Sequence, residues 1–363
     1  MKNPMILFLL LLLLTGCWDQ ENLSDRRLIN GISLDISEEN PNFVHGGIRA
    51  LNIKSQGGGN IEVKAELLTT EKSTTGELGH EIKNNLPGRL DVTKTFIIFI
   101  GDELAKEGIN PLLETFYRAN LGYLPSKVVV VKGKALEILS INDDESPIAF
   151  RVLNGIRSAE SNTLIPELNL FTVWNKMGDE RIDPVLPLIE KNGEKPEVAG
   201  LALFDQDKYT GKNLDTRQST LLLLMRKDLN FIADVFIPYE KNPEKTFRLS
   251  IMGLKRNLDT KVSKDGSIIT NLDLKIKSEL NGNPLGESDL KSLKVQAEEV
   301  ITKRMEEVIT ILQEVHSDPL GIGMDITAKY PQEWKRLDWE KEYKDVEIKL
   351  DVEVEIEKTG GLF

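Results

Sequence analysis

The chain has 363 residues and a formal net charge of −12 at neutral pH, with 40% hydrophobic and 29% charged residues. Such an acidic surface repels phosphate backbones and anionic lipid headgroups, which argues against nucleic acid as a partner and against membrane binding through a basic patch. The length exceeds what one hydrophobic core usually serves, so two or three domains are expected in an ordinary globular body.

The first residues form a leader that is too short to span a membrane stably. The unbroken apolar run from Ile6 to Leu14 is nine residues long, whereas a transmembrane helix needs about 20 apolar residues. Lys2 precedes the run and small residues follow it, an order typical of a secretory signal peptide. We predict that residues 1–16 are removed from the mature protein.

The sequence Leu14-Thr15-Gly16-Cys17 matches the bacterial lipobox, in which an apolar residue and two small residues precede a cysteine. Cys17 is the only cysteine of the chain, and a lone thiol in a secreted protein needs an explanation. Lipidation at this nucleophilic sulfur provides one, and more than one acyl chain gives stable anchoring. We predict that Cys17 carries N-acyl and S-diacylglycerol groups and attaches the protein to the bilayer. The alternative is an ordinary signal peptide followed by an unrelated cysteine.

The first half of the mature chain alternates between predicted strands and helices. The polar stretch 17–25 is predicted to be a lipidated tether. Apolar patterns predict strands at 28–36, 44–53, 61–69, 95–100 and 127–132. Helix-start residues predict helices after Ser73–Glu77, at 102–110, at 111–118 and at 148–159.

A segment dense in Gly, Pro and charge, Gly178 to Pro196, is interpreted as the main domain boundary. Beyond it the pattern predicts a strand at 199–204, a helix at 214–227 and antiparallel strands at 231–237, 247–256 and 267–278. Apolar residues spaced by three and four predict one long helix over 287–316. A short helix is expected over 331–343, and strict alternation predicts a final half-buried strand over 346–356.

Few residues are arranged for chemistry. His80 begins a helix pattern typical of a metalloprotease, but the second histidine is replaced by Asn84. Asp205-Gln206-Asp207 resembles the start of a calcium loop, yet Thr210 stands where glycine must make the turn. Gly321-Ile322-Gly323 is interpreted as a tight turn. We therefore predict no catalytic residue, no metal site and no cofactor, and the protein is not expected to be an enzyme.

Several motifs together resemble one family, the Ger(x)C lipoproteins that form the C subunits of spore germinant receptors. Gly16-Cys17-Trp18-Asp19 resembles the start of the family, and the block Phe99–Ala105 resembles its central strand and helix. Ala199–Phe204 resembles the opening of its second half. Its carboxyl-terminal signature is matched by Ser317–Gly323, and by Tyr330-Pro331 with Trp334 and Trp339. Ser33, where a smaller residue is expected, and the loop Gly57–Gly59 depart from the family.

The resemblance implies a multi-domain α+β protein, each domain a mixed or antiparallel sheet packed with helices, with a long helix against an antiparallel sheet in the C-terminal domain. It implies residues 26–195 as an N-terminal germination-protein region, which could itself divide in two, and residues 196–363 as the C-terminal domain. It implies a non-enzymatic subunit, lipid-anchored on the outer face of the spore inner membrane, which acts with membrane-embedded A and B subunits to trigger nutrient germination.

Two other classes share part of these features. A solute-binding lipoprotein of a transporter also has a lipobox and two lobes, but it requires repeated βαβ units around a parallel sheet. The second half here is predicted to be antiparallel instead. An anchored hydrolase would need a nucleophile or a metal set, and the sequence contains neither pattern.

Overall fold

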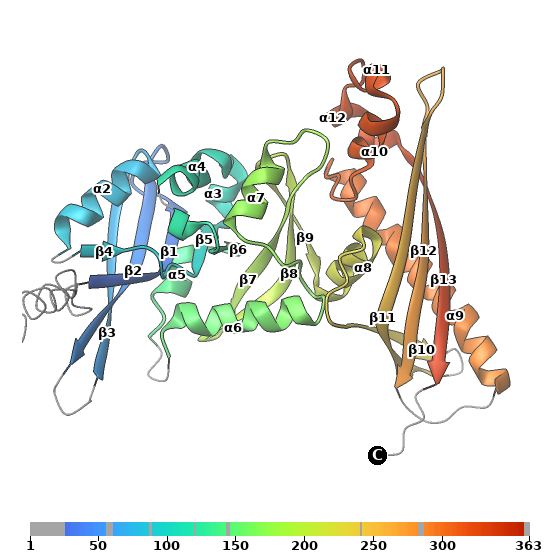
Figure 1. Ribbon diagram of the computed structural model, residues 1–363, viewed down its shortest axis with the longest axis horizontal. Helices are drawn as coiled ribbons and strands as arrows, with labels where there is room; N and C mark the ends of the chain where they lie inside the picture. The colour runs from blue at the N-terminus through green and yellow to red at the C-terminus, as the bar shows by residue number, and fades with distance from the viewer. Residues whose placement is uncertain are drawn as a thin grey trace, which may run out of the picture.

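The protein is described here by a computed structural model, which covers residues 26–55, 61–86, 89–119, 121–142, 146–239, 242–281 and 287–358. Two β-sheets follow one another along the long axis of the molecule, with helices packed on their faces (Figure 1). This α+β architecture is the one the sequence predicts. Residues 1–16, Cys17 and the tether lie outside the described ranges, so the predictions made for them are not addressed by the structure.

In the described parts of the chain, the first sheet has nine strands and occupies the N-terminal part of the molecule. Its strands are β1 (Arg26–Ile36), β2 (Val44–Ser55), β3 (Ile61–Lys72), β4 (Arg89–Asp91), β5 (Ile97–Gly101), β6 (Lys127–Val131), β7 (Val185–Asn192), β8 (Lys195–Asp205) and β9 (Lys208–Asp215). The spatial order is β3-β2-β1-β5-β6-β7-β8-β9, and β4 pairs with the start of β1.

The centre of this sheet is parallel and buried on both faces. β1, β5, β6 and β7 run in the same direction, whereas β2–β3 and β8–β9 are antiparallel pairs at the two sides. Every residue of β5 is buried, and so are the four valines of β6. Unbroken apolar strands are typical of parallel sheets that are covered on both faces.

Helices cover the two faces of the first sheet. Those of this region are α2 (Thr75–Asn85), α3 (Asp102–Glu107), α4 (Asn110–Ala119), the 3₁₀ helix η2 (Leu121–Tyr123), α5 (Ala135–Leu139), α6 (Ile148–Ser161) and α7 (Leu170–Met177). α2, α3, α4 and α7 share one hydrophobic cluster on one face, and α5 and α6 belong to a second cluster on the other. Thr74 caps α2 by accepting a hydrogen bond from the backbone of Glu77, as its sequence predicts.

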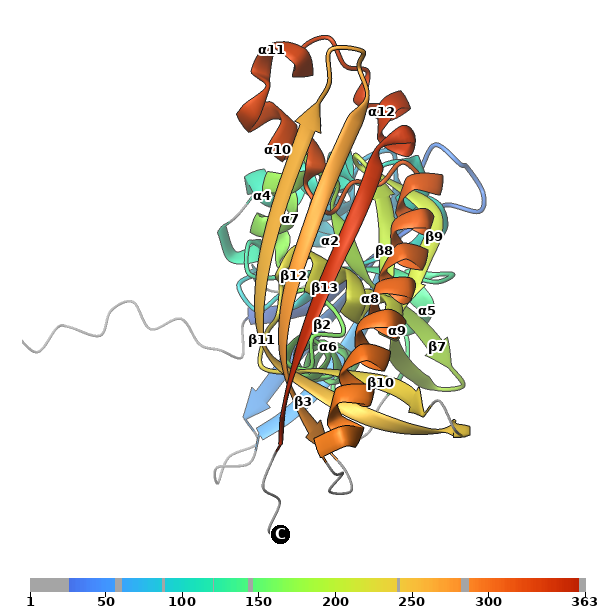
Figure 2. The ribbon, with the colours of Figure 1, turned by 90° about the vertical axis from the view of Figure 1, so that its right-hand side faces the viewer.

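Among the described residues, the second sheet has four strands in the order β10-β11-β12-β13. They are β10 (Ala233–Tyr239), β11 (Asn242–Val262), β12 (Ile268–Asn281) and β13 (Glu347–Lys358). The helices of this half are α8 (Thr216–Arg226), α9 (Glu287–Glu314), α10 (Ile322–Lys329), α11 (Pro331–Trp334), α12 (Trp339–Glu342) and the 3₁₀ helix η3 (Tyr343–Asp345). Figure 2 shows α9 running diagonally beside β13.

One part of the predicted C-terminal sheet is corrected by the structure. β10, β11 and β12 are antiparallel as expected, but β13 runs parallel to β12 over its full length. The chain leaves β12, passes through α9 to α12 and re-enters the sheet beside β12, and a helical crossover of this kind joins parallel strands. Alternation alone predicts which face of a strand is buried and carries no information on its direction.

The long helix matches its predicted stripe. Residues at spacings of three and four on α9 are buried, and none of the central six is more than 6% exposed: Leu293, Ala297, Ile301, Met305, Val308 and Leu312. No helix in the described parts of the chain is both long enough and apolar enough to cross a membrane.

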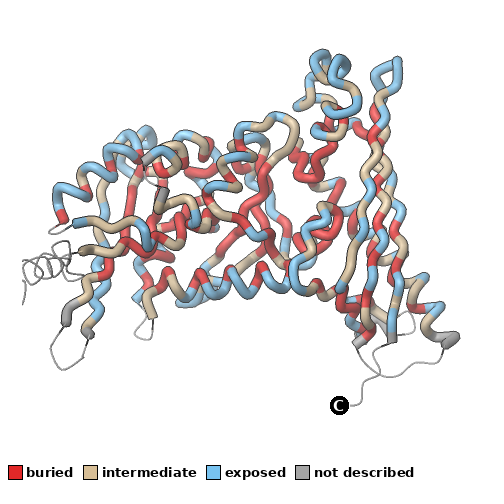
Figure 3. Tube along the Cα trace, in the orientation of Figure 1, coloured by how far each residue is buried: buried red, intermediate tan, exposed pale blue. Residues whose placement is uncertain are grey.

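The segment interpreted as a boundary contains a central strand. β7 lies within residues 178–196, and its first five residues, Val185 to Ile189, are buried between β6 and β8. The first sheet therefore continues across residue 195. One hydrophobic cluster also joins α5 and α6 to α8, α9 and the second sheet, which Figure 3 shows as buried chain running through the middle of the molecule. The division into regions 26–195 and 196–363 remains a prediction.

Candidate functional site at the junction of the two halves

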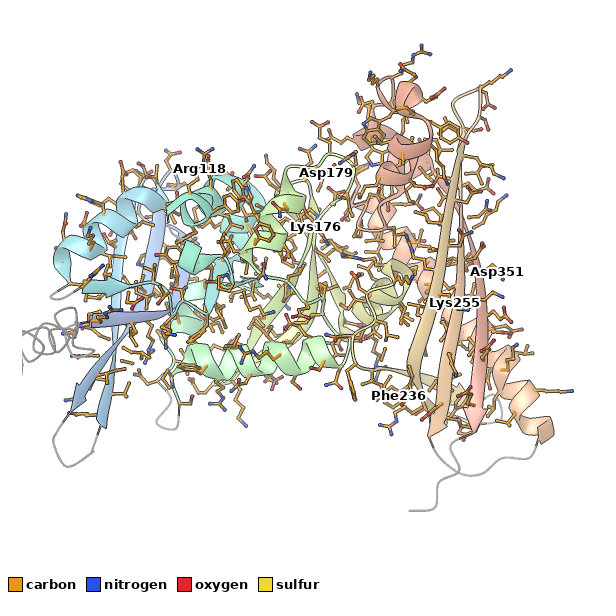
Figure 4. All side chains as sticks on the ribbon, in the orientation of Figure 1. Arg118, Lys176, Asp179, Phe236, Lys255 and Asp351 are labelled. Atoms are coloured by element: carbon orange, nitrogen blue, oxygen red, sulfur yellow. The ribbon has the colours of Figure 1, made fainter. Side chains whose placement is uncertain are left out.

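The two halves of the molecule contact one another where the loop after α7, the turn between β8 and β9, and the segment from α9 to α12 meet. We call this place the junction. Figure 1 shows α10, α11 and α12 beyond the C-terminal end of α9, beside the loop that leaves α7. In Figure 4, Asp179 lies in that loop on the side of the first half that is turned toward these helices. Charged and aromatic side chains gather at this place.

Asp183 and Asp318 hold the junction with reciprocal hydrogen bonds. The backbone amide of Asp183 donates to the carbonyl of Asp318 at 3.0 Å, and the amide of Asp318 donates to the Asp183 carboxylate at 2.6 Å. The other oxygen of Asp183 accepts from the amide of Gln206 at 2.7 Å. One carboxylate thus fixes the β8–β9 turn and the loop after α9 to the same point.

The Asp318 carboxylate organises the start of α10. It accepts hydrogen bonds from the amides of Gly321, Ile322 and Gly323 at 2.9, 3.2 and 2.9 Å. Gly321 has φ +77°, a left-handed conformation that glycine adopts without strain. A Cβ at Gly323 would lie 2.8 Å from the carbonyl oxygen of Arg181. Gly321 makes the turn, whereas Ile322 and Gly323, which were predicted to belong to it, are the first residues of α10.

Three aromatic rings pack beside this turn. The ring centroids of Trp334 and Trp339 are 5.6 Å apart, and those of Trp339 and Tyr343 are 5.4 Å apart. The single helix predicted over 331–343 is wrong, because α11 and α12 are separate four-residue helices. The break between them lets two tryptophans five residues apart face one another, which a continuous helix would not allow.

An open cavity of about 560 Å³ lies over the junction. Carboxylates dominate its lining, which also contains one lysine and one histidine. The lining residues are Glu180, Asp183, Asp205, Gln206, His316, Trp334, Lys335, Leu337, Asp338, Trp339 and Glu340.

Burial shifts the acid groups of the junction toward their neutral forms. Desolvation raises the pKa of Asp183 to about 7 and that of Asp318 to about 6, against the hydrogen bonds that favour the ionised carboxylates. Burial raises the pKa of Asp205 as well, and the nearby charge of Glu340 adds to this shift. Burial also raises the pKa of the Tyr343 hydroxyl well above its ordinary value, so this group stays neutral.

Two side chains connect the junction to the second sheet. The Arg256 guanidinium, on β11, donates to the carbonyls of Met225 and Leu320 at 2.5 and 2.8 Å. The Asp325 carboxylate, on α10, accepts from the amide of Thr260 on β11 at 2.8 Å. The contacts with Leu320 and Asp325 join β11 to the junction, and the contact with Met225 joins it to α8. The second sheet is therefore positioned together with α10.

This arrangement is built to fix orientation. The oxygens of Asp183 and Asp318 accept hydrogen bonds from five backbone amides, so these two side chains hold the backbone in place. Within the described residues, no group of three His, Cys, Asp or Glu side chains could hold a metal ion. The junction instead couples the first sheet, α10 and the second sheet.

The residues of the incomplete metalloprotease and calcium-loop motifs lie apart from one another in the structure. His80 is exposed on α2, where its ring is 3.1 Å from the Asn84 amide. Asp205 lines the junction cavity, whereas the Asp207 carboxylate accepts from the amide of Asn110 at 3.2 Å. The two aspartates of the supposed calcium loop thus lie in different environments, at the turn that joins β8 to β9.

The importance of Asp183 was missed by sequence analysis because it lies in the segment interpreted as a boundary. A signal was available, since Asp183-Pro184 and Asp318-Pro319 are both Asp-Pro pairs. Proline holds the preceding residue in an extended conformation and ends a helix, so each pair marks a rigid loop. The sequence does not show that the two loops meet.

Comparison with known proteins covers nearly the whole chain. The family description "Spore germination protein N-terminal domain" matches residues 19–191, and "Spore germination B3/ GerAC like, C-terminal" matches residues 199–360. "Spore germination protein GerQC" of Bacillus cereus is 23% identical, over 99% of both chains. "Spore germination protein KC" of Bacillus subtilis (strain 168) is 24% identical, over 98% of this chain and 95% of that one. The crystal structure of the GerBC protein shares the fold, with a TM-score of 0.58 and 15% identity over 93% of this chain and 99% of that one.

Proposed function

The chain belongs to the Ger(x)C family of germinant receptor C subunits, and from this premise we propose that it is a lipid-anchored subunit that acts with membrane-embedded A and B subunits to trigger spore germination in response to nutrients. The observation that carries the proposal is that both family domains match in order and leave almost none of the chain outside them. The lipobox ending at Cys17 precedes the first of them directly.

The length of the tether supports a location close to the membrane. The eight residues from Trp18 to Asp25 lie between Cys17 and the start of β1. An extended chain of that length spans at most about 29 Å, so an anchor at Cys17 keeps the first sheet near the bilayer, on the outer face of the spore inner membrane. Confinement to that layer raises the effective concentration of membrane partners, and weak interfaces then suffice.

The junction supports a role in interaction without catalysis. Its buried carboxylates are held by backbone amides, and the family is not a known class of enzyme. Family membership also argues against the alternative of a solute-binding lipoprotein. In our proposal the body is a rigid adaptor, whose two halves keep a fixed orientation over the membrane.

The anchor is tested by Cys17→Ala. We expect intact protein that leaves the membrane fraction of spores, and mass spectrometry of the parent should find the acyl groups on Cys17. Ser24→Ala in the tether is the matched control and should remain with the membrane. A Cys17→Ala protein that still fractionates with membranes lacking the A and B subunits would contradict anchoring through Cys17.

The partnership is tested by deleting either companion subunit. We expect the nutrient response of this receptor to be lost in each deletion, with germination by routes that bypass receptors intact. A nutrient response that depends on this chain and survives both deletions would overturn the proposal.

A further inference from the structure

β3 is a regular edge strand at the end of the molecule opposite the second sheet (Figure 1). It pairs with β2 in an unbroken antiparallel register from Val44–Lys72 to Ser55–Ile61. It contains no proline and no glycine. A long regular edge strand presents a row of backbone N–H and C=O groups to another chain.

The other three terminal strands are covered. On β10, the carbonyl of Phe236 accepts from Arg304 at 2.8 Å, and that of Pro238 accepts from Gln296 at 2.7 Å. On β13, the amide of Val354 donates to Glu298 at 2.9 Å. These three capping side chains come from α9, and β9 is packed against α3.

No comparable cover exists on β3 in the described parts of the chain. No side chain there forms a hydrogen bond with the backbone of residues 63–69. One face of the strand exposes apolar groups, since Val63 is 51% and Leu67 is 37% exposed and Ala65 between them is exposed as well. In Figure 3, β3 is largely pale blue, the colour of exposed residues.

The charges of β3 identify which strand would fit. Lys64 and Glu66 are exposed on the opposite face from Val63, Ala65 and Leu67, because side chains alternate along a strand. If a second β3 pairs antiparallel with Ala65 opposite Ala65, each Lys64 lies opposite a Glu66 and each Val63 opposite a Leu67. Opposite charges and apolar pairs placed this way both stabilise a sheet.

Other registers of the same pairing are poorer. Moving the centre by one residue, to Lys64 or Glu66, places like charges opposite one another, which destabilises a sheet. A centre at Val63 keeps Lys64 opposite Glu62, but only residues 61–65 of β3 then pair. The centre at Ala65 pairs residues 61–69.

We infer that the β3 edge is a homodimer interface, in which two copies of this chain pair antiparallel through residues 61–69 with Ala65 on the twofold axis. This joins two first sheets into one continuous sheet and covers both exposed edges. The inference concerns the folded body and does not depend on the proposed anchor or on the companion subunits.

Charge exchange tests the pairing and its register. The soluble chain from Trp18 contains every described helix and strand, and its association is measured by sedimentation velocity up to high micromolar concentration. We expect Lys64→Glu and Glu66→Lys to weaken self-association at least about tenfold, because each places like charges opposite one another. An equimolar mixture of the two variants should dimerise again, since every position then pairs Lys with Glu. Unaltered association of both variants, or a mixture that stays monomeric, would overturn the inference.

A matched control lies on β13, a terminal strand of the second sheet that α9 covers. Lys349 on β13 is 3.3 Å from Glu347, much as Lys64 is 3.0 Å from Glu62 on β3. Lys349→Glu should leave association unchanged. A loss of the dimer as large as that caused by Lys64→Glu would attribute the effect to net charge and would contradict the β3 interface.

Disulfide trapping detects a weak dimer directly. The chain from Trp18 has no cysteine, so Ala65→Cys introduces a single thiol on the proposed twofold axis. Oxidation with copper phenanthroline should cross-link this variant, whereas Thr69→Cys on the same strand should not, because its counterpart lies opposite residue 61. A monomeric parent together with equal cross-linking of the two variants would show that β3 meets another partner or none.

Discussion

The junction between the two halves and the β3 edge handle charge in opposite ways. At the junction, Asp183 and Asp318 are buried, and backbone amides hold their carboxylates. At the β3 edge, Lys64 and Glu66 are exposed, and the strand backbone has one neighbour instead of two. Burial of the carboxylates at the junction has a desolvation cost, and their hydrogen bonds fix one geometry. The β3 edge leaves backbone groups available to another molecule.

The difference separates what stabilises this fold from what can connect it to partners. Removing a buried carboxylate leaves the amides that it binds without an acceptor and lowers the free energy of unfolding. Removing an exposed charge changes the free energy of unfolding little. Substitutions at the junction should therefore act on stability and abundance, and substitutions on β3 should act on association.

Asp318→Ala is expected to have the largest effect. It removes the acceptor of three buried amides at the start of α10, and we expect the free energy of unfolding to fall by about 3 kcal/mol or more. Urea denaturation followed by tryptophan fluorescence measures this. The control is Asp351→Ala, on the exposed side of β13 (Figure 4), which should change stability by less than about 0.5 kcal/mol. Equal effects of the two substitutions would remove the distinction.

Trp339→Ala should lower the free energy of unfolding somewhat less than Asp318→Ala. The ring contacts Trp334 and Tyr343 and is half-buried, so its truncation is expected to cost about 3 kcal/mol, and Trp339→Phe about half as much. Quantitative immunoblots of spores should show less subunit in the alanine variant, in proportion to any loss of germination. Full abundance without germination would instead identify Trp339 as a partner contact.

The junction should also make stability depend on pH. The pKa values of Asp183 and Asp318 are raised to about 7 and about 6, above the ordinary value near 4. Their contribution to stability is therefore complete below about pH 4 and is lost as pH rises through about 6 and 7. We expect the urea concentration at the unfolding midpoint to decrease as pH rises from 5 to 8, and to decrease less in Asp183→Asn. A midpoint that rises over this interval in the parent would contradict the account.

Lys64→Glu should have the smallest effect on folding. Lys64 is exposed and its ion pair with Glu62 is a surface pair, so the free energy of unfolding should change by less than about 0.5 kcal/mol. The same substitution is expected to weaken self-association at least about tenfold. Thermal unfolding at a concentration where the chain is monomeric checks the first statement, and a large loss of stability would place Lys64 among the structural residues.

Much of this fold follows from local patterns. Continuous apolar runs predict β5 and β6, and regular spacing predicts α9, because each pattern depends on one element and one buried face. β7 was not predicted, since Pro187 and the surrounding glycines and charges resemble a linker. Its burial depends on β6 and β8, which lie on either side of it only in the folded sheet.

The candidate site depends on contacts that a single sequence does not reveal. Asp183 and Asp318 are 135 positions apart and meet through the fold. The parallel direction of β13 likewise follows from the crossover through α9 to α12. The family could be predicted from the sequence alone, because short motifs such as Ser317–Gly323 retain their order along the chain. The geometry of the site could not.

The germination response of spores is the sharpest test of whether this subunit works as an anchored body at the membrane, as we propose. The native copy is replaced by the chain without Cys17 and its leader, produced inside the developing spore compartment and exported by a cleavable non-lipoprotein signal, at equal abundance. We expect a weak or absent response to nutrients, with germination by receptor-independent routes unchanged. A full nutrient response from the anchorless chain would contradict it.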